Sequence, residues 1–482
     1  MDKRVVLILW VVTAFPSVMM AQDKHFIVQV KCESDIPTDI LVIPATLKYD
    51  KEFAFSFTFD DTHNDAFNLG YKLLSGGYSS VDGNTYPGLF STDGCGNRFP
   101  FRAGIAWITA NSDMIDLHKG TLSYLTYAEA TVLYQSGWDF FNHSYNHEAN
   151  NPSIDYRWQL TANSQTFKDN TGIDLNYHIP PAGDNNYLDP AFSVGIAACF
   201  TSGSEYIGFA GGADVMIPVP SIKPVYWRQD INSDDDSAAS LKRNIDLWVA
   251  TTGQGNQKWW NEFTHRIEYT HIASSVEFPE FREYFEYMEQ KYGSSGRDNG
   301  WFASSAEVFE YLKVRDKIVI QLQKNDSVLD IHLDYSQVPA NLRYYDLSIL
   351  IKNPVSVQSV SASNQVTLAH SVTSNGYLIN IDIPDSHFSG VDPVANGIQT
   401  LLNGYPNPSN GKYYLQIPHQ PDQVDISITN MMAEIMPRPD IRMSAGLISM
   451  EFTPEIYPPG LYIIRVISRD HLIGFSKVFI NY

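Results

Sequence analysis

The sequence predicts a multidomain protein in which an α/β domain with a mostly parallel sheet or barrel precedes two small all-β domains. The chain has 482 residues, too many for a single core. From about residue 50 to 316, short aromatic or β-branched runs alternate with helical patterns, as in α/β folds. Beyond 316 the helical patterns stop, and short alternating strands separated by turn residues indicate β-sandwiches.

Strands of the α/β domain are expected at 53–59, 101–109 and 138–144. The first reads FAFSFTF, so its phenylalanines share one face and its small residues share the other. Such a strand is buried on both sides, which is typical of a central strand in an α/β domain.

Helices are expected between these strands. Thr126 followed by Glu129 predicts a capping box and a helix start, and Ser304 with Glu307 repeats the pattern. The segment 278–293 is a third amphipathic helix pattern. Strands and helices therefore alternate through this part of the chain.

The first residues have the pattern of a secretory signal peptide. Lys3 and Arg4 precede an apolar run at 5–18, and Ala21 stands where a signal peptidase cuts. The run is too short for a transmembrane helix, and we expect no such helix elsewhere. The expected units are a signal peptide at 1–21, the α/β domain with an N-terminal extension at 22–316, a β-sandwich at 317–400 and a C-terminal domain at 401–482.

The composition restricts the partners. Asp and Glu (54) outnumber Lys and Arg (33), so the formal net charge is −21 and the pI is about 4.9. Nucleic acids and anionic membranes repel such a surface, and we exclude both as partners. The sequence has three cysteines, Cys32, Cys95 and Cys199, and no CxxC motif, which excludes a cysteine zinc site. Because their number is odd, at least one is a free thiol, and no disulfide can be assigned.

Two histidines follow the third expected strand. In WDFFNHSYNHEAN (138–150), His143 and His147 are four residues apart. On a helical turn with Ser144 as N-cap, both imidazoles would lie on one face and chelate a divalent metal. The alternative is that both are exposed surface histidines. For an HxxxH pair taken in isolation, this alternative is favoured by about two to one.

Two carboxylates follow the first expected strand. Where the chain bends into a loop, Asp60 and Asp61 are both expected to face a cavity at the carboxyl end of the sheet. Two adjacent buried carboxylates need a cation or a proton, and a helix-capping turn explains only one of them. One aspartate with the two histidines would form an open metal site of the kind used by hydrolases. The other aspartate would be free to act as general base.

The motifs FTFDDTHND and NHSYNH resemble the first two motifs of the polysaccharide deacetylases (the NodB-homology group, carbohydrate esterase family 4) over about 45–316. The resemblance implies an irregular (β/α) barrel with fewer than eight repeats. It also implies that Asp60 is the catalytic base, and that Asp61, His143 and His147 bind a divalent metal, most often Zn²⁺.

A third family motif, R-P-P-[YF]-G, is only partly matched by YHIPPAGDNNY. Ile179 stands where the family has arginine, and Ala182 stands where it has an aromatic residue. The backbone N–H of Ala182 still suits the oxyanion role, because that role needs no side chain. The missing arginine leaves the orientation of Asp60 open. His178 is either its substitute or a loop histidine without a role.

A later family motif supplies a histidine that protonates the leaving group. His265, in EFTH, resembles this motif and is preferred over His271, six residues further on. The aspartate that tunes this histidine in the family is matched weakly by Asp230.

The C-terminal segment, about 403–482, resembles the sorting domain of the type IX secretion system of Bacteroidetes. YPNPSNGKYYLQI, VDISITNMMAEIM and PPGLYIIRVI carry the resemblance. It implies export across the outer membrane, with the secretion machinery as partner. The alternative is a further β-sandwich module for binding.

These features together predict a secreted or cell-surface metal-dependent carbohydrate deacetylase that acts on an acetylated glycan. Two alternatives stay open. One is a glycan-binding or adhesive protein on an impaired deacetylase scaffold, and the other is hydrolysis of a different acyl or amide bond.

Overall fold

A computed structural model describes most of the chain beyond the expected signal peptide, which lies outside the described residues. These are residues 24–112, 115–116, 121–122, 124–202, 213–214, 223–353, 356–363, 366–383, 404–405, 409, 411–416, 425–430, 436–444, 447–468 and 471–480. Within them, no helix is both long and apolar enough to span a membrane.

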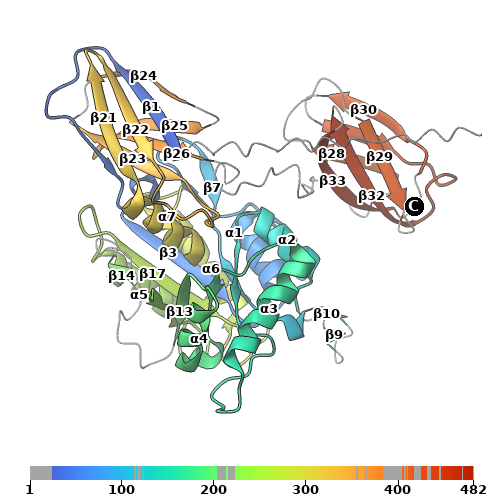
Figure 1. Ribbon diagram of the computed structural model, residues 1–482. Coiled ribbons are helices and arrows are strands. Elements are labelled where there is room, and N and C mark those ends of the chain that lie inside the picture. The colour runs from blue at the N-terminus through green and yellow to red at the C-terminus, as the bar shows by residue number, and fades with distance from the viewer. Residues whose placement is uncertain are drawn as a thin grey trace, which may run out of the picture.

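The central unit is a nearly closed barrel of parallel strands (Figure 1). The strands pair in the order β17-β3-β8-β11-β12-β13-β15; β16 returns to β17, and β20 pairs with β3. The expected fold class is therefore confirmed. The bounds are β3 (Phe53–Phe59), β8 (Gly104–Trp107), β11 (Asp139–Asn142), β12 (Tyr177–His178), β13 (Ala198–Thr201), β15 (Val225–Trp227), β16 (Gln229–Asp230), β17 (Lys258–Thr264) and β20 (Gly300–Phe302).

Seven α-helices accompany the described strands of this unit. They are α1 (Lys72–Ser75), α2 (Tyr127–Gln135), α3 (Tyr156–Thr171), α4 (Leu188–Ser193), α5 (Ala238–Val249), α6 (Phe278–Tyr292) and α7 (Ser305–Lys317). The capping box of Thr126 and Glu129 starts α2 as predicted. At α7 only half of the second box forms, because Ser304 caps the N–H of Glu307 while the Glu307 carboxylate binds Lys48 and Arg102 instead.

Strand β3 is buried on both faces, as its sequence predicts. Its phenylalanines point outward, and the Phe57 ring lies 5.2 Å from that of Phe285 on α6. The small residues point into the barrel, where Ser56 accepts a hydrogen bond of 2.9 Å from the Trp259 indole. Because side chains alternate along a strand, Asp60 continues this inner row at the end of β3.

The barrel shares a core with a β domain, and α7 connects the two. Two four-stranded antiparallel sheets form this domain, in the orders β21-β22-β1-β24 and β2-β23-β26-β25 (Figure 1). The N-terminal extension thus contributes two strands to the domain that we placed at 317–400. The bounds are β1 (His25–Cys32), β2 (Leu41–Pro44), β21 (Val319–Asn325), β22 (Val328–Asp334), β23 (Leu347–Lys352), β24 (Val357–Ala362), β25 (Thr367–Thr373) and β26 (Gly376–Asp382).

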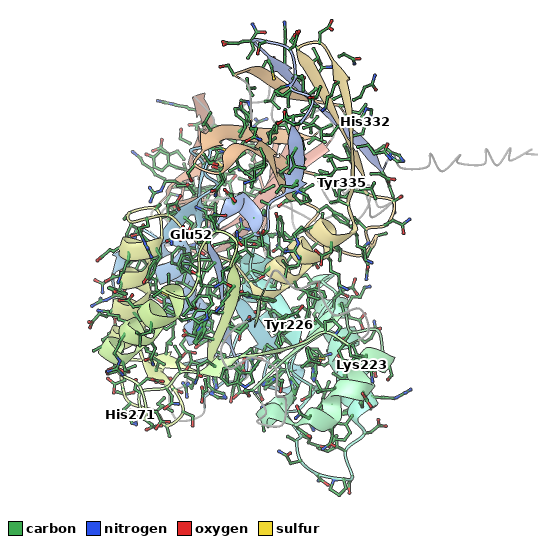
Figure 2. All side chains as sticks on the ribbon, turned by 90° about the vertical axis from the view of Figure 1, so that its left-hand side faces the viewer. Glu52, Lys223, Tyr226, His271, His332 and Tyr335 are labelled. Atoms are coloured by element: carbon green, nitrogen blue, oxygen red, sulfur yellow. The ribbon has the colours of Figure 1, made fainter. Side chains whose placement is uncertain are left out.

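The two ends of the barrel differ in their surroundings. Figure 2 shows Glu52, which precedes β3, on the side near the β domain, and His271, which follows β17, at the opposite end. The carboxyl ends of the parallel strands therefore meet at the end away from the β domain. Short two-stranded pairs surround the barrel: β4 (Gly77–Tyr78) with β5 (Thr85–Tyr86), β6 (Phe90–Thr92) with β7 (Arg98–Pro100), β9 (Ile115–Asp116) with β10 (Thr121–Leu122), and β18 (Ile267–Glu268) with β19 (Val276–Glu277); β14 (Ala213–Asp214) pairs with β17.

The C-terminal domain has its own hydrophobic core, which includes Ile428, Ile448 and Ile464. Its antiparallel sheets have the orders β27-β28-β31-β30 and β29-β32-β33. The bounds are β27 (Gly404–Tyr405), β28 (Lys412–Gln416), β29 (Asp425–Asn430), β30 (Asp440–Ser444), β31 (Leu447–Glu451), β32 (Gly460–Ser468) and β33 (His471–Ile480).

All three cysteines are free thiols.

Candidate active site

The chain turns sharply after β3, at the two aspartates. Asp61 and Thr62 have positive φ angles of 68° and 64°. Such angles cost a non-glycine residue on the order of 1–3 kcal/mol and persist only where the surroundings hold them. Here the buried Thr62 hydroxyl accepts the Ile108 N–H at 2.7 Å, and the Thr62 carbonyl accepts the Leu125 N–H at 2.8 Å. The turn therefore lets Asp60 and Asp61 both lie close to His143 and His265.

The two histidines lie in a loop between β11 and α3. The expected helical turn is wrong, because α3 begins only at Tyr156, with Asp155 as its N-cap. Ser144 and His147 instead have positive φ angles of 66° and 61°. The Ser144 hydroxyl accepts the His147 N–H at 2.9 Å, which closes the loop and brings the imidazoles together.

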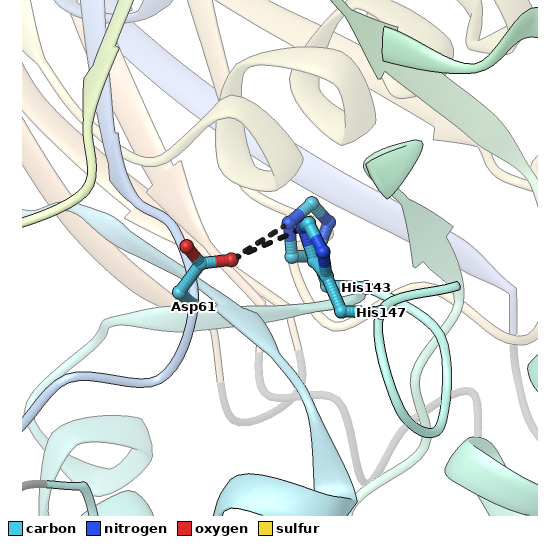
Figure 3. A group of neighbouring side chains, drawn as sticks. All are labelled: Asp61, His143 and His147. Atoms are coloured by element: carbon cyan, nitrogen blue, oxygen red, sulfur yellow. Dashed lines mark ion pairs between the residues drawn. The ribbon is translucent and has the colours of Figure 1, made fainter. Parts of the chain in front are cut away.

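Asp61, His143 and His147 form one cluster (Figure 3). Asp61 Oδ1 lies 3.4 Å from His143 Nε2 and 3.3 Å from His147 Nε2. His143 Nδ1 is 2.7 Å from the Ile179 carbonyl, so this nitrogen carries the proton and Nε2 presents its lone pair to the cluster. The structure thus unites all three residues expected to bind metal.

The cluster fits a divalent metal. Asp61 Oδ1 is buried, and no hydrogen bond reaches it within the described part of the chain. Two ligand bonds of about 2.0–2.1 Å at a tetrahedral angle place their atoms about 3.3–3.4 Å apart, which matches both separations from this oxygen. Burial raises the pKa of Asp61, but the adjacent His143, His147 and His265 outweigh it and hold this pKa well below its usual range.

Asp60 is held by an arginine that the sequence reasoning missed. Arg228 binds both Asp60 oxygens at 2.9 Å and also donates to the Thr58 hydroxyl at 2.6 Å. Burial raises the pKa of Asp60, but the Arg228 guanidinium, with His143 and His265, brings this pKa below its usual value. Arg228 follows β15, two residues before Asp230, and a buried arginine requires an anion. The arginine in YWRQD was therefore the sequence signal that could have pointed to a partner for a carboxylate of the site.

His178 does not replace the missing arginine. It is fully buried on β12, its Nδ1 lies 2.7 Å from the Asn142 carbonyl, and its ring packs against Tyr187. Burial lowers the pKa of His178 to about 3. The histidine is therefore neutral at ordinary pH and does not neutralise a carboxylate.

Buried amides position the histidine loop, and sequence patterns did not reveal them. Asn142 Oδ1 accepts the Ser144 N–H at 2.9 Å and the Asn163 amide at 3.0 Å. Gln159 Oε1 accepts the N–H groups of Tyr145 and Asn146 at 3.0 and 3.2 Å. Because isolated Asn and Gln residues are usually exposed, only the fold identifies these as buried supports.

His265 lies near Asp60 and Asp61, and Ala182 follows the segment whose Ile179 carbonyl binds His143. His265 Nδ1 is 3.0 Å from the Ser274 carbonyl, which directs Nε2 elsewhere, and its charge lowers the pKa values of Asp60 and Asp61. Ala182 lies three residues after the Ile179 carbonyl that binds His143, and its φ is 50°. His271 instead forms ion pairs at the surface with Asp234 and Glu277.

Fold and site together define a parallel α/β barrel with an open Asp, His, His centre of the type found in metal hydrolases. Residues 403–481 match the family "Secretion system C-terminal sorting domain", which bears out the expected C-terminal domain and indicates secretion to the cell surface or beyond. No curated protein sequence matches the chain.

Several solved deacetylase structures are similar to the chain. The deacetylase PplD of Streptococcus pyogenes in complex with acetate is 18% identical over 31% of this chain and 55% of its own, with a TM-score of 0.22. The peptidoglycan deacetylase PdaC of Bacillus subtilis is 12% identical over 56% and 95%, with a TM-score of 0.28. A family 4 acetyl xylan esterase of Clostridium thermocellum in complex with a cobalt ion is 12% identical over 54% and 91%, with a TM-score of 0.30. With TM-scores this low, the similarity carries no argument about the site.

Proposed function

We propose that this protein is a secreted metal-dependent deacetylase that removes acetyl groups from a poly- or oligosaccharide. The observation that carries the proposal is the cluster of Asp61, His143 and His147 beside an Asp60 that Arg228 holds ionised. A structural carboxylate pair would need no such cluster, whereas metal-dependent hydrolysis uses a metal ligand set and a separate base.

Asp61, His143 and His147 would hold the metal, and their ligand types and spacing fit Zn²⁺. When bound, the metal supplies Lewis acidity, which polarises the acetyl carbonyl and eases deprotonation of water. The chain's other groups carry the proton transfers and stabilise the developing charge.

Asp60 takes the proton of the attacking water as the water oxygen bonds to the acetyl carbon. The Ala182 N–H donates to the oxyanion that develops on the carbonyl oxygen. His265 then gives a proton to the leaving amine or alkoxide as its bond to the acetyl carbon breaks. The products are acetate and the deacetylated sugar.

The alternative of an impaired glycan-binding scaffold was motivated by the missing motif-three arginine and by the two β domains without catalytic residues. Arg228 supplies a guanidinium to Asp60 from the segment after β15, which removes the first of these two motivations and supports turnover.

Metal analysis combined with acetate release from a panel of N- and O-acetylated glycans tests the proposal. We expect Asp60→Asn to abolish turnover while metal stays bound, and His143→Ala to abolish both. Acetate release that survives in Asp60→Asn contradicts the assignment of the base. Bound metal without acetate release from any glycan favours another acyl substrate, and neither metal nor acetate favours a binding protein.

A further inference from the structure

An exposed tryptophan lies next to the histidine loop. Trp158 is 49% exposed, while the other tryptophans of the described residues are buried or half-buried. An indole buries a large apolar area where it packs, so an exposed one contributes little to folding. About half of the surface of this residue is thus available for contact with a ligand.

Trp158 packs against Tyr145, the residue midway between His143 and His147. The two ring centroids lie 5.1 Å apart, with the planes tilted by 53°. Tyr145 is two residues from each histidine, so at most about 7 Å of chain separates it from either. The aromatic pair is thus attached to the loop that carries both histidines of the candidate metal site.

The backbone that carries each ring is held by hydrogen bonds. The backbone N–H of Trp158 donates to the Asp155 side chain at 3.0 Å, which caps the first turn of α3 that carries the indole. The adjacent Gln159 accepts the Tyr145 N–H, and the Tyr145 carbonyl accepts the Ala110 N–H at 2.9 Å. A preorganised surface binds with less entropic loss than a mobile one.

The surroundings of the pair select the kind of ligand. Its exposed neighbours are polar, among them Asn146, Glu148 and Arg157. Two rings among these polar neighbours offer less contiguous apolar area than the centre of a typical protein interface. A pyranose ring instead presents C–H groups to the negative face of an aromatic ring and hydroxyl groups to polar neighbours at its edge.

We propose that Trp158 and Tyr145 form a stacking platform for a sugar unit next to the acetylated unit at the metal site. The inference rests on the proposed function and deepens it, since the platform selects a chain of sugars over a single acetylated sugar. The net charge of −21 favours a neutral or basic chain.

The test compares Trp158→Ala with the wild-type, metal-loaded full chain. The probes are N-acetylglucosamine oligomers of increasing length, acetylated xylooligosaccharides and 4-nitrophenyl acetate, which has no sugar. We expect the variant to raise KM at least about tenfold for the longer oligomers of the preferred sugar, with unchanged turnover of 4-nitrophenyl acetate. Trp158→Phe keeps a ring and should recover part of the loss.

Leu247→Ala is the matched control, because Leu247 is 64% exposed on α5 and outside the site. An equal loss on all probes, an unchanged KM for every oligomer, or a change of oligomeric state in Trp158→Ala overturns the platform. If the wild type releases no acetate, the proposed function fails and the platform is judged by oligomer binding in calorimetry. Weaker binding by Trp158→Ala then supports it, and equal or absent binding overturns it.

Discussion

Replacement of Arg228 by methionine should destabilise the fold and impair the base. The variant keeps an unbranched apolar stem but removes the guanidinium and its three hydrogen bonds, two of them to Asp60 at 2.9 Å. Arg228 is 1% exposed and Asp60 is 3% exposed, so water does not replace the lost partner. Removal of one member of a buried ion pair costs about 3–5 kcal/mol. We therefore expect a loss of this size in urea unfolding, together with a large fall in kcat.

A double-mutant cycle separates this pairing from general damage. Asp60→Asn combined with Arg228→Met removes both charges, so the double variant should be more stable than the sum of the single losses implies. Arg98→Met is the matched control, because Arg98 is exposed and should change stability by less than about 1 kcal/mol. A loss below about 1 kcal/mol in Arg228→Met, or no coupling in the cycle, would falsify this reasoning.

Three further predictions concern the metal, the pH dependence and the loop supports. Zinc at about 100 times its Kd should stabilise the fold by about 2.7 kcal/mol. Calorimetry should show this gain in Asp60→Asn but not in His147→Ala, and a gain in both variants argues against the ligand set. Burial raises the pKa of Glu262 to about 8, although Trp260 and Tyr284 donate hydrogen bonds to it. The folded state therefore holds a proton that the unfolded state loses above about pH 4.3, so stability falls as pH rises from there to about 8. Glu262→Gln should flatten this slope in thermal melts from pH 5 to 9, and an unchanged slope contradicts the assignment. Asn163→Ala removes one of the donors to the Asn142 amide oxygen and to the Trp107 carbonyl and leaves the buried Thr109 N–H without its acceptor, so it should cost about 1–3 kcal/mol and weaken zinc binding in a titration. Stability loss without weaker zinc binding would make Asn163 purely structural.

Local patterns predicted the elements around the site well. The alternation in FAFSFTF identified a strand buried on both faces, because side-chain direction in a strand depends only on residue parity. The capping box at Thr126 identified a helix start, because its hydrogen bonds join residues three apart. The spacing of His143 and His147 was misread as a helical turn, since the same spacing also fits a loop that buried amides hold in shape.

By itself, the sequence determined the α/β barrel, the β domains and the three candidate metal ligands, because these depend on local periodicity and on motifs at strand ends. Only the tertiary structure decided what holds Asp60. Arg228 is 168 positions away and meets Asp60 because both point into the barrel at the carboxyl ends of its strands. Likewise, only the fold placed β1 and β2 in sheets with strands from beyond residue 317. Contacts between distant segments are set by sheet closure and register, which no short window of sequence contains.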